Sequence, residues 1–320
     1  MSPGRILIVR LGAMGDILHA LPAAASFRAS APGGHIAWIA HPRWRDLLDG
    51  NPVVDEFIPF DRSSIASVTA AWKAMRRAPF DAVIDFQGLT QSALVAFAAR
   101  GGKRFGFHYS LVRETPAALF YHEHCKTQAA HVVEMNLDLA RLAGADQRRL
   151  EAPLPQGRPE GRLPEGRFVL ASPLAGWVPK QWPLEYYTRL ARRLRHELGA
   201  ALVVNGAPAQ EAALRGVEDA EVHISSVAGL IYATRRATAV LGLDSGPLHL
   251  AAALGIPAVA LFGPTDPARN GPWGESVTVL RLPAAETTYA REARIHPSMR
   301  ELHPDMVFEA LRHRLGEGRP

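Results

Sequence analysis

The sequence predicts an α/β protein made of two Rossmann-like domains that face each other across a cleft. Three observations predict this fold class. Short apolar runs alternate with helical patterns along the chain, a segment rich in proline and glycine interrupts them once, and the alternation then resumes in a half of similar size. The length of 320 residues also suits two domains, because one domain typically holds about 100–200 residues.

Runs of apolar and β-branched residues predict the strands. In the first half they occupy residues 5–10, 35–40, 56–60, 81–86 and 103–107, and in the second half residues 167–172, 200–205, 221–224, 237–243, 257–262 and 276–280. Several runs are apolar almost throughout, which is typical of parallel strands buried on both faces. Helical patterns lie between them, for example at 17–29, 64–77, 128–142, 183–198 and 247–254.

The interruption predicts the domain boundary. Residues 151–166 read EAPLPQGRPEGRLPEG, without periodicity, so they predict a linker between domains 1–150 and 167–320. In open α/β sheets, ligands bind beyond the carboxyl ends of the strands. We therefore expect the chemistry in the loops that follow strands, on both walls of the cleft.

Composition excludes several classes of protein. No apolar run reaches the ~18–20 residues that span a bilayer, and the first residues lack the apolar region of a signal peptide. A single cysteine, Cys125, excludes an intramolecular disulfide framework, so we expect a cytoplasmic protein. The nearby His122, His124 and His131 do not have a zinc-site spacing, and we expect no metal and no cofactor.

The net charge of +5 points to an anionic partner but leaves its nature open. The basic residues are spread along the chain, without a block of lysine and arginine interleaved with aromatic residues, so we expect no nucleic acid. Two interpretations remain. The arginine content reflects genomic codon bias, or it forms a patch for a phosphorylated ligand or a membrane surface.

The first loop of interest, residues 11–16, directly follows the first strand. Gly12 and Gly15 let the backbone turn tightly and approach a ligand. Their spacing is not the dinucleotide fingerprint Gly-x-Gly-x-x-Gly, which disfavours an NAD enzyme. Asp16 lies in the first turn of the next helix. It either caps that helix or accepts a proton from a substrate hydroxyl.

Three further loops follow strands and place polar side chains. Asp85 ends a strand, just before Gln87, and we expect it to cap the next helix or else to position a polar substrate. Arg113 either grips an anionic acceptor or pairs with Glu114 on the surface. Lys180 is either a point charge for phosphate or a solvated surface lysine.

The most informative segment is the turn after the strand at 237–243. Asp244 ends the strand, and the N–H groups of Ser245 and Gly246 at the start of a helix form a ready anion site. His249 falls in the first turn of that helix. Thr265 lies in a second polar turn, after the next strand. Two such turns on adjacent strands are hard to explain by packing alone. Motifs typical of hydrolases and of P-loop NTPases do not occur in the sequence.

These motifs resemble those of the lipopolysaccharide heptosyltransferases, glycosyltransferase family 9. The matching segments are DSGPLHLAAALGIP at 244–257, LFGPTDP at 261–267 and ILIVRLGAMGDILHALP at 6–22, and the resemblance covers nearly the whole chain. Segment 80–89, FDAVIDFQGL, is most similar to the heptosyltransferase I branch. The resemblance implies a GT-B fold and transfer of a heptose, with inversion, from a nucleotide-sugar donor such as ADP-heptose. It also implies an anionic Kdo-lipid A acceptor and peripheral contact with the cytoplasmic face of the inner membrane.

The resemblance also implies roles for individual residues. Asp16 corresponds to the general base. The expected donor-binding residues are Lys180, Asp244, Ser245, Gly246, His249 and Thr265, and the expected acceptor-binding residues are Gly12, Gly15, Gln87 and Arg113. The chain departs from the family at residues 226–229, which lack the carboxylate thought to hold the donor ribose. Two alternatives therefore stay open: a transferase of the same fold with another donor or acceptor, and a non-catalytic nucleotide-sugar-binding protein.

Overall fold

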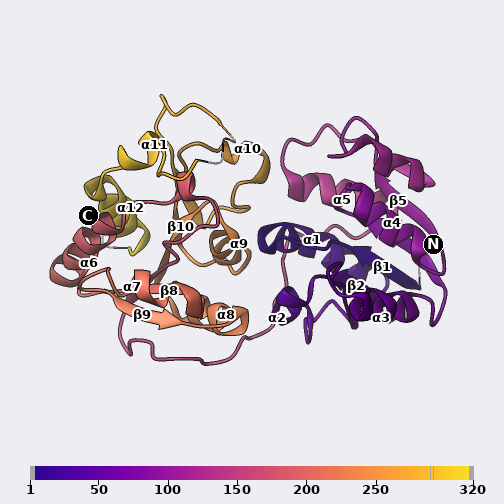
Figure 1. The fold of residues 1–320 in the computed structure, drawn as a ribbon, viewed down its shortest axis with the longest axis horizontal. Helices are drawn as coiled ribbons and strands as arrows, with labels where there is room; N and C mark the ends of the chain where they lie inside the picture. Colours follow the sequence, from indigo (N-terminus) through magenta and orange to yellow (C-terminus); the bar gives the residue numbers. More distant parts are fainter. Residues whose placement is uncertain (1–3, 289, 291, 317–320) are drawn as a thin grey trace. The chain divides into compact units, whose positions relative to one another are not determined.

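A computed structural model describes residues 4–288, 290 and 292–316 of the chain. The chain forms two compact units, residues 1–155 and 156–320, and each is built on a six-stranded parallel sheet (Figure 1). Their boundary falls inside the segment that the sequence predicts as a linker. Within the described part of the chain, no helix is both long and apolar enough to cross a membrane.

The first unit alternates strands with helices. Its strands are β1 (Arg5–Val9), β2 (His35–Ala40), β3 (Glu56–Pro59), β4 (Phe80–Asp85), β5 (Gly101–Phe107) and β6 (Glu123–Cys125). Its helices are α1 (Met14–Ser30), α2 (Arg45–Leu48), α3 (Ile65–Met75), α4 (Thr90–Ala98) and α5 (Val132–Leu142), with the 3-10 turns η1 (Pro42–Trp44) and η2 (Thr115–Phe120). The strand order is β3-β2-β1-β4-β5-β6, and every pairing is parallel.

The second unit repeats this plan. Its strands are β7 (Phe168–Ala171), β8 (Ala201–Gly206), β9 (Glu221–Ile224), β10 (Ala239–Leu243), β11 (Ala258–Leu261) and β12 (Val277–Leu280). Its helices are α6 (Leu184–Leu198), α7 (Glu211–Leu214), α8 (Val227–Arg236), α9 (Gly246–Ala253), α10 (Pro267–Asn270), α11 (Pro297–Arg300) and α12 (Pro304–Arg314), with the 3-10 turns η3 (Val178–Lys180) and η4 (Pro208–Gln210). The strand order is β12-β11-β10-β7-β8-β9, again all parallel.

Each sheet therefore has one topological switch point. The chain of each unit begins at a central strand, builds outward to one edge, and then returns to build the other half of the sheet. The switch points lie between β1 and β4 in the first unit and between β7 and β10 in the second. At such a point the loops beyond neighbouring strands diverge and leave room for a ligand.

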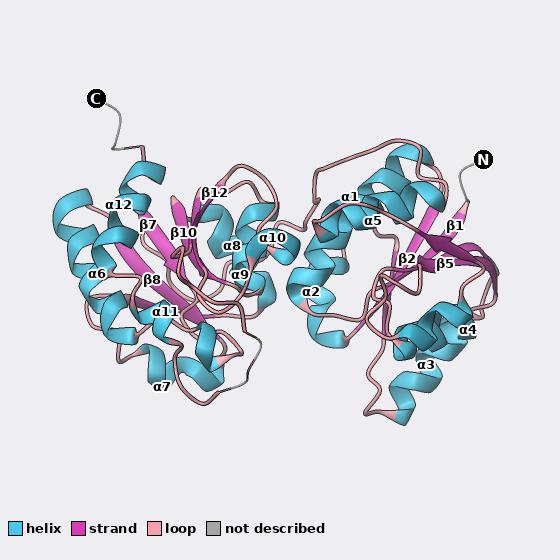
Figure 2. Cartoon of the chain, turned by 90° about the horizontal axis from the view of Figure 1, so that it is seen from above, coloured by secondary structure: helices cyan, strands magenta, loops and turns pink. Residues whose placement is uncertain are grey.

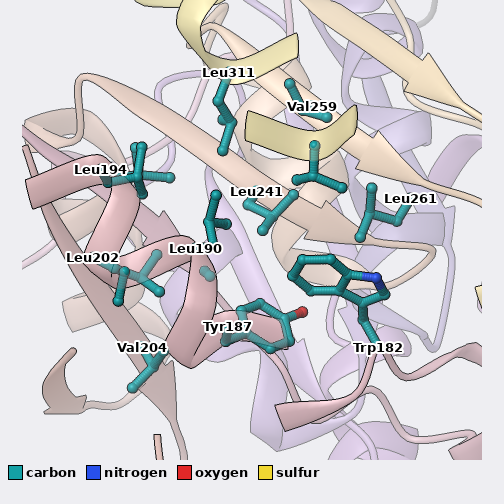
Figure 3. Close-up of a cluster of buried hydrophobic side chains, with 14 of the residues drawn as sticks. Trp182, Tyr187, Leu190, Leu194, Leu202, Val204, Leu241, Val259, Leu261 and Leu311 are labelled. Carbon is teal, nitrogen blue, oxygen red and sulfur yellow. The ribbon is translucent and has the colours of Figure 1, made fainter. Parts of the chain in front are cut away.

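Helices cover both faces of these sheets, which explains the apolar strand sequences (Figure 2). In the second unit, α6 packs an apolar stripe of Tyr187, Leu190 and Leu194 against the sheet, and all three side chains are fully buried. Figure 3 shows this stripe against Leu241 of β10 and Leu311 of α12. The two cores hold the carboxyl ends of the strands in fixed positions.

All eleven predicted strands are confirmed, with ends within two residues of the prediction. The twelfth, β6, was missed because its sequence, Glu-His-Cys, is short and largely polar. The helix predicted from residue 128 begins at Val132 instead, because the side chain of His131 accepts a hydrogen bond from the backbone N–H of Val133 and caps it.

The end of the predicted linker packs on the second unit. The Glu160 carboxylate accepts hydrogen bonds from the backbone N–H and the hydroxyl of Ser226, both at 2.7 Å, at the start of α8. Burial raises the pKa of this carboxyl group, but the hydrogen bonds from Ser226 outweigh that effect and leave it below its usual range. In addition, the backbone N–H of Arg158 donates to the carbonyl of Ala228. Residues 158–160 are thus an ordered part of the second unit.

Candidate active-site residues

The loop after β1 places Asp16 in the first turn of α1. One oxygen of its carboxylate lies 2.7 Å from Nη2 of Arg10, and the other accepts a hydrogen bond of 2.9 Å from the backbone N–H of Ala13. Arg10 is buried at the end of β1, and its other guanidinium nitrogen donates to the carbonyl of Phe86, after β4. Because 38% of the Asp16 side chain is exposed, this fixed carboxylate can still meet a substrate.

Gly12 and Gln87 are brought together at the first switch point. The side-chain oxygen of Gln87 accepts a hydrogen bond of 2.8 Å from the backbone N–H of Leu11, which joins the two loops. Gly12 has a φ of +156°, and a Cβ there would lie 2.9 Å from Nε1 of Trp44, so only glycine fits. Gly15 is in the first turn of α1. The loops after β1 and β4 therefore meet.

The prediction that Asp85 caps the next helix is wrong. The N-cap of α4 is Leu89, and Asp85 is fully buried at the end of β4. Its carboxylate accepts hydrogen bonds from the backbone N–H of Gln87 at 2.8 Å and from the hydroxyls of Ser92 and Tyr121 at 2.7 Å. Burial raises the pKa of Asp85, and these hydrogen bonds oppose that rise. The buried Asp85 carboxylate therefore holds the turn at Gln87 and Gly88 in place.

Arg113 lies beside the same turn. Its backbone N–H donates to the carbonyl of Gly88 at 3.1 Å, and its side chain is exposed. The Glu114 carboxylate accepts a hydrogen bond from the backbone N–H of Thr90, and this contact and the charge of Arg113 lower the pKa of that carboxyl group. The Arg113 guanidinium is thus directed to solvent next to the first switch point.

At the second switch point the structure joins two residues that the sequence analysis treated separately. Nζ of Lys180, after β7, lies 2.5 Å from Oδ2 of Asp244, after β10. The same ammonium group lies 4.6 Å from the centre of the Trp177 ring, a cation–π contact that the sequence analysis did not foresee. Nε2 of His249 is 3.9 Å from Oδ1 of Asp244. These groups form one charged cluster.

The start of α9 completes this cluster. Ser245 is the N-cap residue and Gly246 the first helical residue, so their backbone N–H groups point out of the helix end. Pro247 follows as the second helical residue. Thr265, after β11, is buried, and its hydroxyl has no hydrogen-bond partner within the described residues. The end of the second sheet thus offers a cation, helix N–H groups and a hydroxyl to an anionic ligand.

A pocket of about 180 Å³ opens beside this cluster, at the carboxyl edge of the second sheet. Its lining includes Ser172 after β7, Gly206 at the end of β8, Ser225 after β9 and Pro247 in α9. Asn205 also lines it, and donates to the hydroxyl of Ser225 at 2.8 Å. This pocket was not predicted from the sequence, although an asparagine at the end of an apolar strand is a signal for it.

The chain is similar to proteins of one family. The model of glycosyltransferase family 9 (heptosyltransferase) matches residues 68–297. Lipopolysaccharide heptosyltransferase 1 of Escherichia coli (strain K12) is 28% identical over 299 residues, which cover 87% of this chain and 94% of that protein.

Two solved structures are also similar. The E. coli heptosyltransferase WaaC with ADP has a TM-score of 0.79 at 27% identity, over 97% of this chain and 99% of that one. The same enzyme with ADP-2-deoxy-2-fluoro heptose has a TM-score of 0.77 at 26% identity, over 98% of this chain and 100% of that one. The likeness includes both units, and it confirms the predicted fold class, α/β of the GT-B type.

Proposed function

The chain belongs to glycosyltransferase family 9, and from this premise we propose that it moves a heptose from ADP-heptose to a Kdo-lipid A acceptor, with inversion at the anomeric carbon. The observation that carries the proposal is the contrast between the two switch points. One holds a fixed carboxylate, Asp16, and the other holds Lys180 and the start of α9. A displacement reaction needs both a base and a site for a diphosphate leaving group.

In the proposed reaction, Asp16 accepts the proton of an acceptor hydroxyl. The hydroxyl oxygen forms a bond to the anomeric carbon, and the bond from that carbon to the diphosphate breaks on the opposite face. Arg10 and the Ala13 N–H hold the carboxylate in place for this step. General-base catalysis of this kind typically contributes ~10²–10⁴-fold to a rate.

The departing nucleoside diphosphate carries the negative charge that forms in the reaction. Lys180, His249 and the N–H groups of Ser245 and Gly246 are the groups that stabilise it. Because Lys180 already pairs with Asp244, binding of a diphosphate competes for the ammonium group. Asp244 then becomes free to accept hydrogen bonds from sugar hydroxyls.

The pocket lined by Ser172, Asn205 and Ser225 is where we place the nucleoside. The similar E. coli enzyme holds ADP, which supports an adenine nucleotide as the donor. Residues 226–229 lack a carboxylate of their own, but the carboxylate of Glu160 lies against Ser226. This difference also keeps a second candidate open, a transferase of the same fold that uses another nucleotide sugar.

We assign the acceptor to the first unit and the donor to the second. The acceptor residues are Gly12, Gly15, Gln87 and Arg113, around the first switch point. The Arg113 guanidinium suits an anionic glycolipid, because it forms bidentate hydrogen bonds with carboxylate or phosphate. An acceptor anchored in a bilayer places the protein at the cytoplasmic face of the inner membrane, in peripheral contact with it.

The test is to incubate the protein with ADP-heptose and Kdo-lipid A and to analyse the lipid by mass spectrometry. We expect a lipid that has gained one heptose, with an anomeric configuration opposite to that of the donor by NMR. Transfer from UDP- or GDP-sugars, but not from ADP-heptose, would establish the second candidate. Donor binding without transfer to any acceptor would indicate a binding protein.

A further inference from the structure

Two neighbouring helices of the first unit expose large apolar side chains. On α3, Ile65, Val68 and Trp72 have exposed fractions of 84%, 37% and 49%. On α4, Leu94 and Phe97 have exposed fractions of 49% and 57%. Spacings of three, four and seven residues place each set on one side of its helix. We call these five side chains and the groove between them the α3–α4 face.

The groove has a volume of about 430 Å³ and is lined from both helices. Val68, Trp72 and Met75 of α3 lie on one side, and Leu94 and Val95 of α4 on the other. The two helices lie next to each other beside the first sheet (Figure 2). Contiguous apolar surface of this kind is uncommon on a soluble protein and marks a site of association.

Most charges near the face are positive, although Lys103 pairs with Glu123 at 2.6 Å and Arg77 lies 3.9 Å from Glu56. Segments 62–80 and 86–113, which contain both helices, hold eight lysines and arginines and no aspartate or glutamate. Since the whole chain has a net charge of +5, the rest of the molecule is net negative. Lys73 and Arg76 are exposed on α3, and the guanidinium of Arg76 lies 4.8 Å from the centre of the Trp72 ring.

A cation also lies over an aromatic ring of α4: the guanidinium of Arg104, on β5, is 5.1 Å from the centre of the Phe97 ring. Aromatic and aliphatic side chains ringed by cations are typical of surfaces that lie in the interface of a bilayer, with the rings at the level of the headgroups. A second copy of this face would bring the two sets of positive charge together, which disfavours self-association.

We propose that the α3–α4 face docks the protein on a membrane surface rich in anionic lipid, with Trp72 and Phe97 inserted among the headgroups. This proposal rests on the proposed function, in which the acceptor resides in a bilayer, and adds the surface that binds the membrane. The geometry of the α3–α4 face itself does not depend on the reaction. Electrostatic attraction draws the basic segments to the surface, and insertion of the apolar side chains then holds them there.

The experiment measures binding of the full-length protein to vesicles of phosphatidylcholine with and without 30% phosphatidylglycerol, by co-sedimentation. The vesicles contain no acceptor lipid, so the result is independent of transfer activity. We expect binding to the anionic vesicles only, and weaker binding at high salt. Lys73→Gln combined with Arg76→Gln should lower the partition coefficient about 30-fold, and Trp72→Ser combined with Phe97→Ser at least tenfold.

The matched controls lie on the second unit. Arg189→Gln combined with Arg236→Gln removes two exposed cations, and Met306→Ser removes an exposed apolar side chain. These variants should bind vesicles like the unmodified protein. Circular dichroism verifies folding, and the charge variant, which changes only exposed side chains, keeps the test valid if the serine variant fails to fold.

Three results would overturn the proposal: equal binding to both kinds of vesicle, equal losses in the control variants, or a dimer in solution that Lys73→Gln with Arg76→Gln converts to a monomer. Calorimetric titration of ADP into the same proteins separates this proposal from the proposed function. Vesicle binding without ADP binding would retain the docking face and contradict the donor assignment. ADP binding without vesicle binding would retain the donor assignment and contradict the docking face.

Discussion

The two switch points have the same topology but opposite chemistry. In the first unit, the residues after β1 and β4 hold a half-exposed carboxylate, Asp16, against the buried guanidinium of Arg10. In the second unit, the residues after β7 and β10 hold an ammonium group, Lys180, against the carboxylate of Asp244, beside the start of α9. Both clusters contain an ion pair, which lies within the segment after β1 in the first unit and joins two loops in the second.

The difference lies in the groups that surround each ion pair. Arg10 also donates to the carbonyl of Phe86, so the group left facing outward is the Asp16 carboxylate. In the second unit Asp244 is near both Lys180 and His249, and the free N–H groups of α9 add positive potential. The two sheets share one topology, and the loops that follow their strands decide which charge each switch point presents.

Removal of the Asp16 carboxylate from the first unit should have the largest effect on the rate of transfer. Asp16→Asn keeps the shape but removes the base, so we expect transfer to slow by ~10²–10⁴-fold in kcat, with little change in donor KM. Asp49→Asn, which alters an exposed carboxylate of the same unit, is the control. Near-normal turnover of the Asp16 variant would exclude the base assignment.

Removal of the cation from the second unit should have the next largest effect. In the proposed reaction Lys180 contacts the diphosphate, so we expect Lys180→Gln to lower donor affinity about 10–100-fold. The measurement is the donor KM, with Arg189→Gln on α6 as a control for charge. An unchanged KM would mean that the Lys180–Asp244 pair is only structural.

The buried hydrogen bonds of Asp85, next to the first switch point, should contribute to the free energy of unfolding. Tyr121→Phe removes one of the donors to the buried Asp85 carboxylate, and we expect the free energy of unfolding to fall by about 1–3 kcal/mol. Urea denaturation measures this change, and Tyr109→Phe, in an exposed loop, should cause none. If the two variants are equally stable, Asp85 does not depend on Tyr121.

A smaller effect should appear in the second unit, at Glu160. The pKa of this carboxyl group is lower in the folded protein than in the unfolded chain, so it stabilises the fold above its unfolded pKa. This stabilisation is lost as the pH falls through the folded pKa. We expect Glu160→Gln to be less stable than the unmodified protein at pH 7 and the difference to shrink as the pH falls from 7 through the folded pKa of Glu160. Urea denaturation across this range tests it, with Glu165→Gln as the control.

The sequence predicted most of the fold, because buried parallel strands are marked by continuous apolar runs. It also placed Asp16, Lys180 and Asp244 in segments that follow strands. It missed contacts that join distant parts of the chain, such as Glu160 with Ser226 and Lys180 with Asp244. Such contacts depend on strand order, which no local pattern encodes. The role of Arg10 was missed although Asp16 is close in the sequence, because the contact of Arg10 with the carbonyl of Phe86 depends on the pairing of β1 with β4.

Calorimetric titration of ADP into Asp16→Asn and Lys180→Gln, measured side by side, tests the division of labour between the two units most directly. If the first switch point supplies the base and the second binds the donor, the Asp16 variant binds ADP like the unmodified protein. The Lys180 variant then binds it at least tenfold more weakly. Weakened ADP binding by the Asp16 variant, together with unchanged binding by the Lys180 variant, would contradict the account.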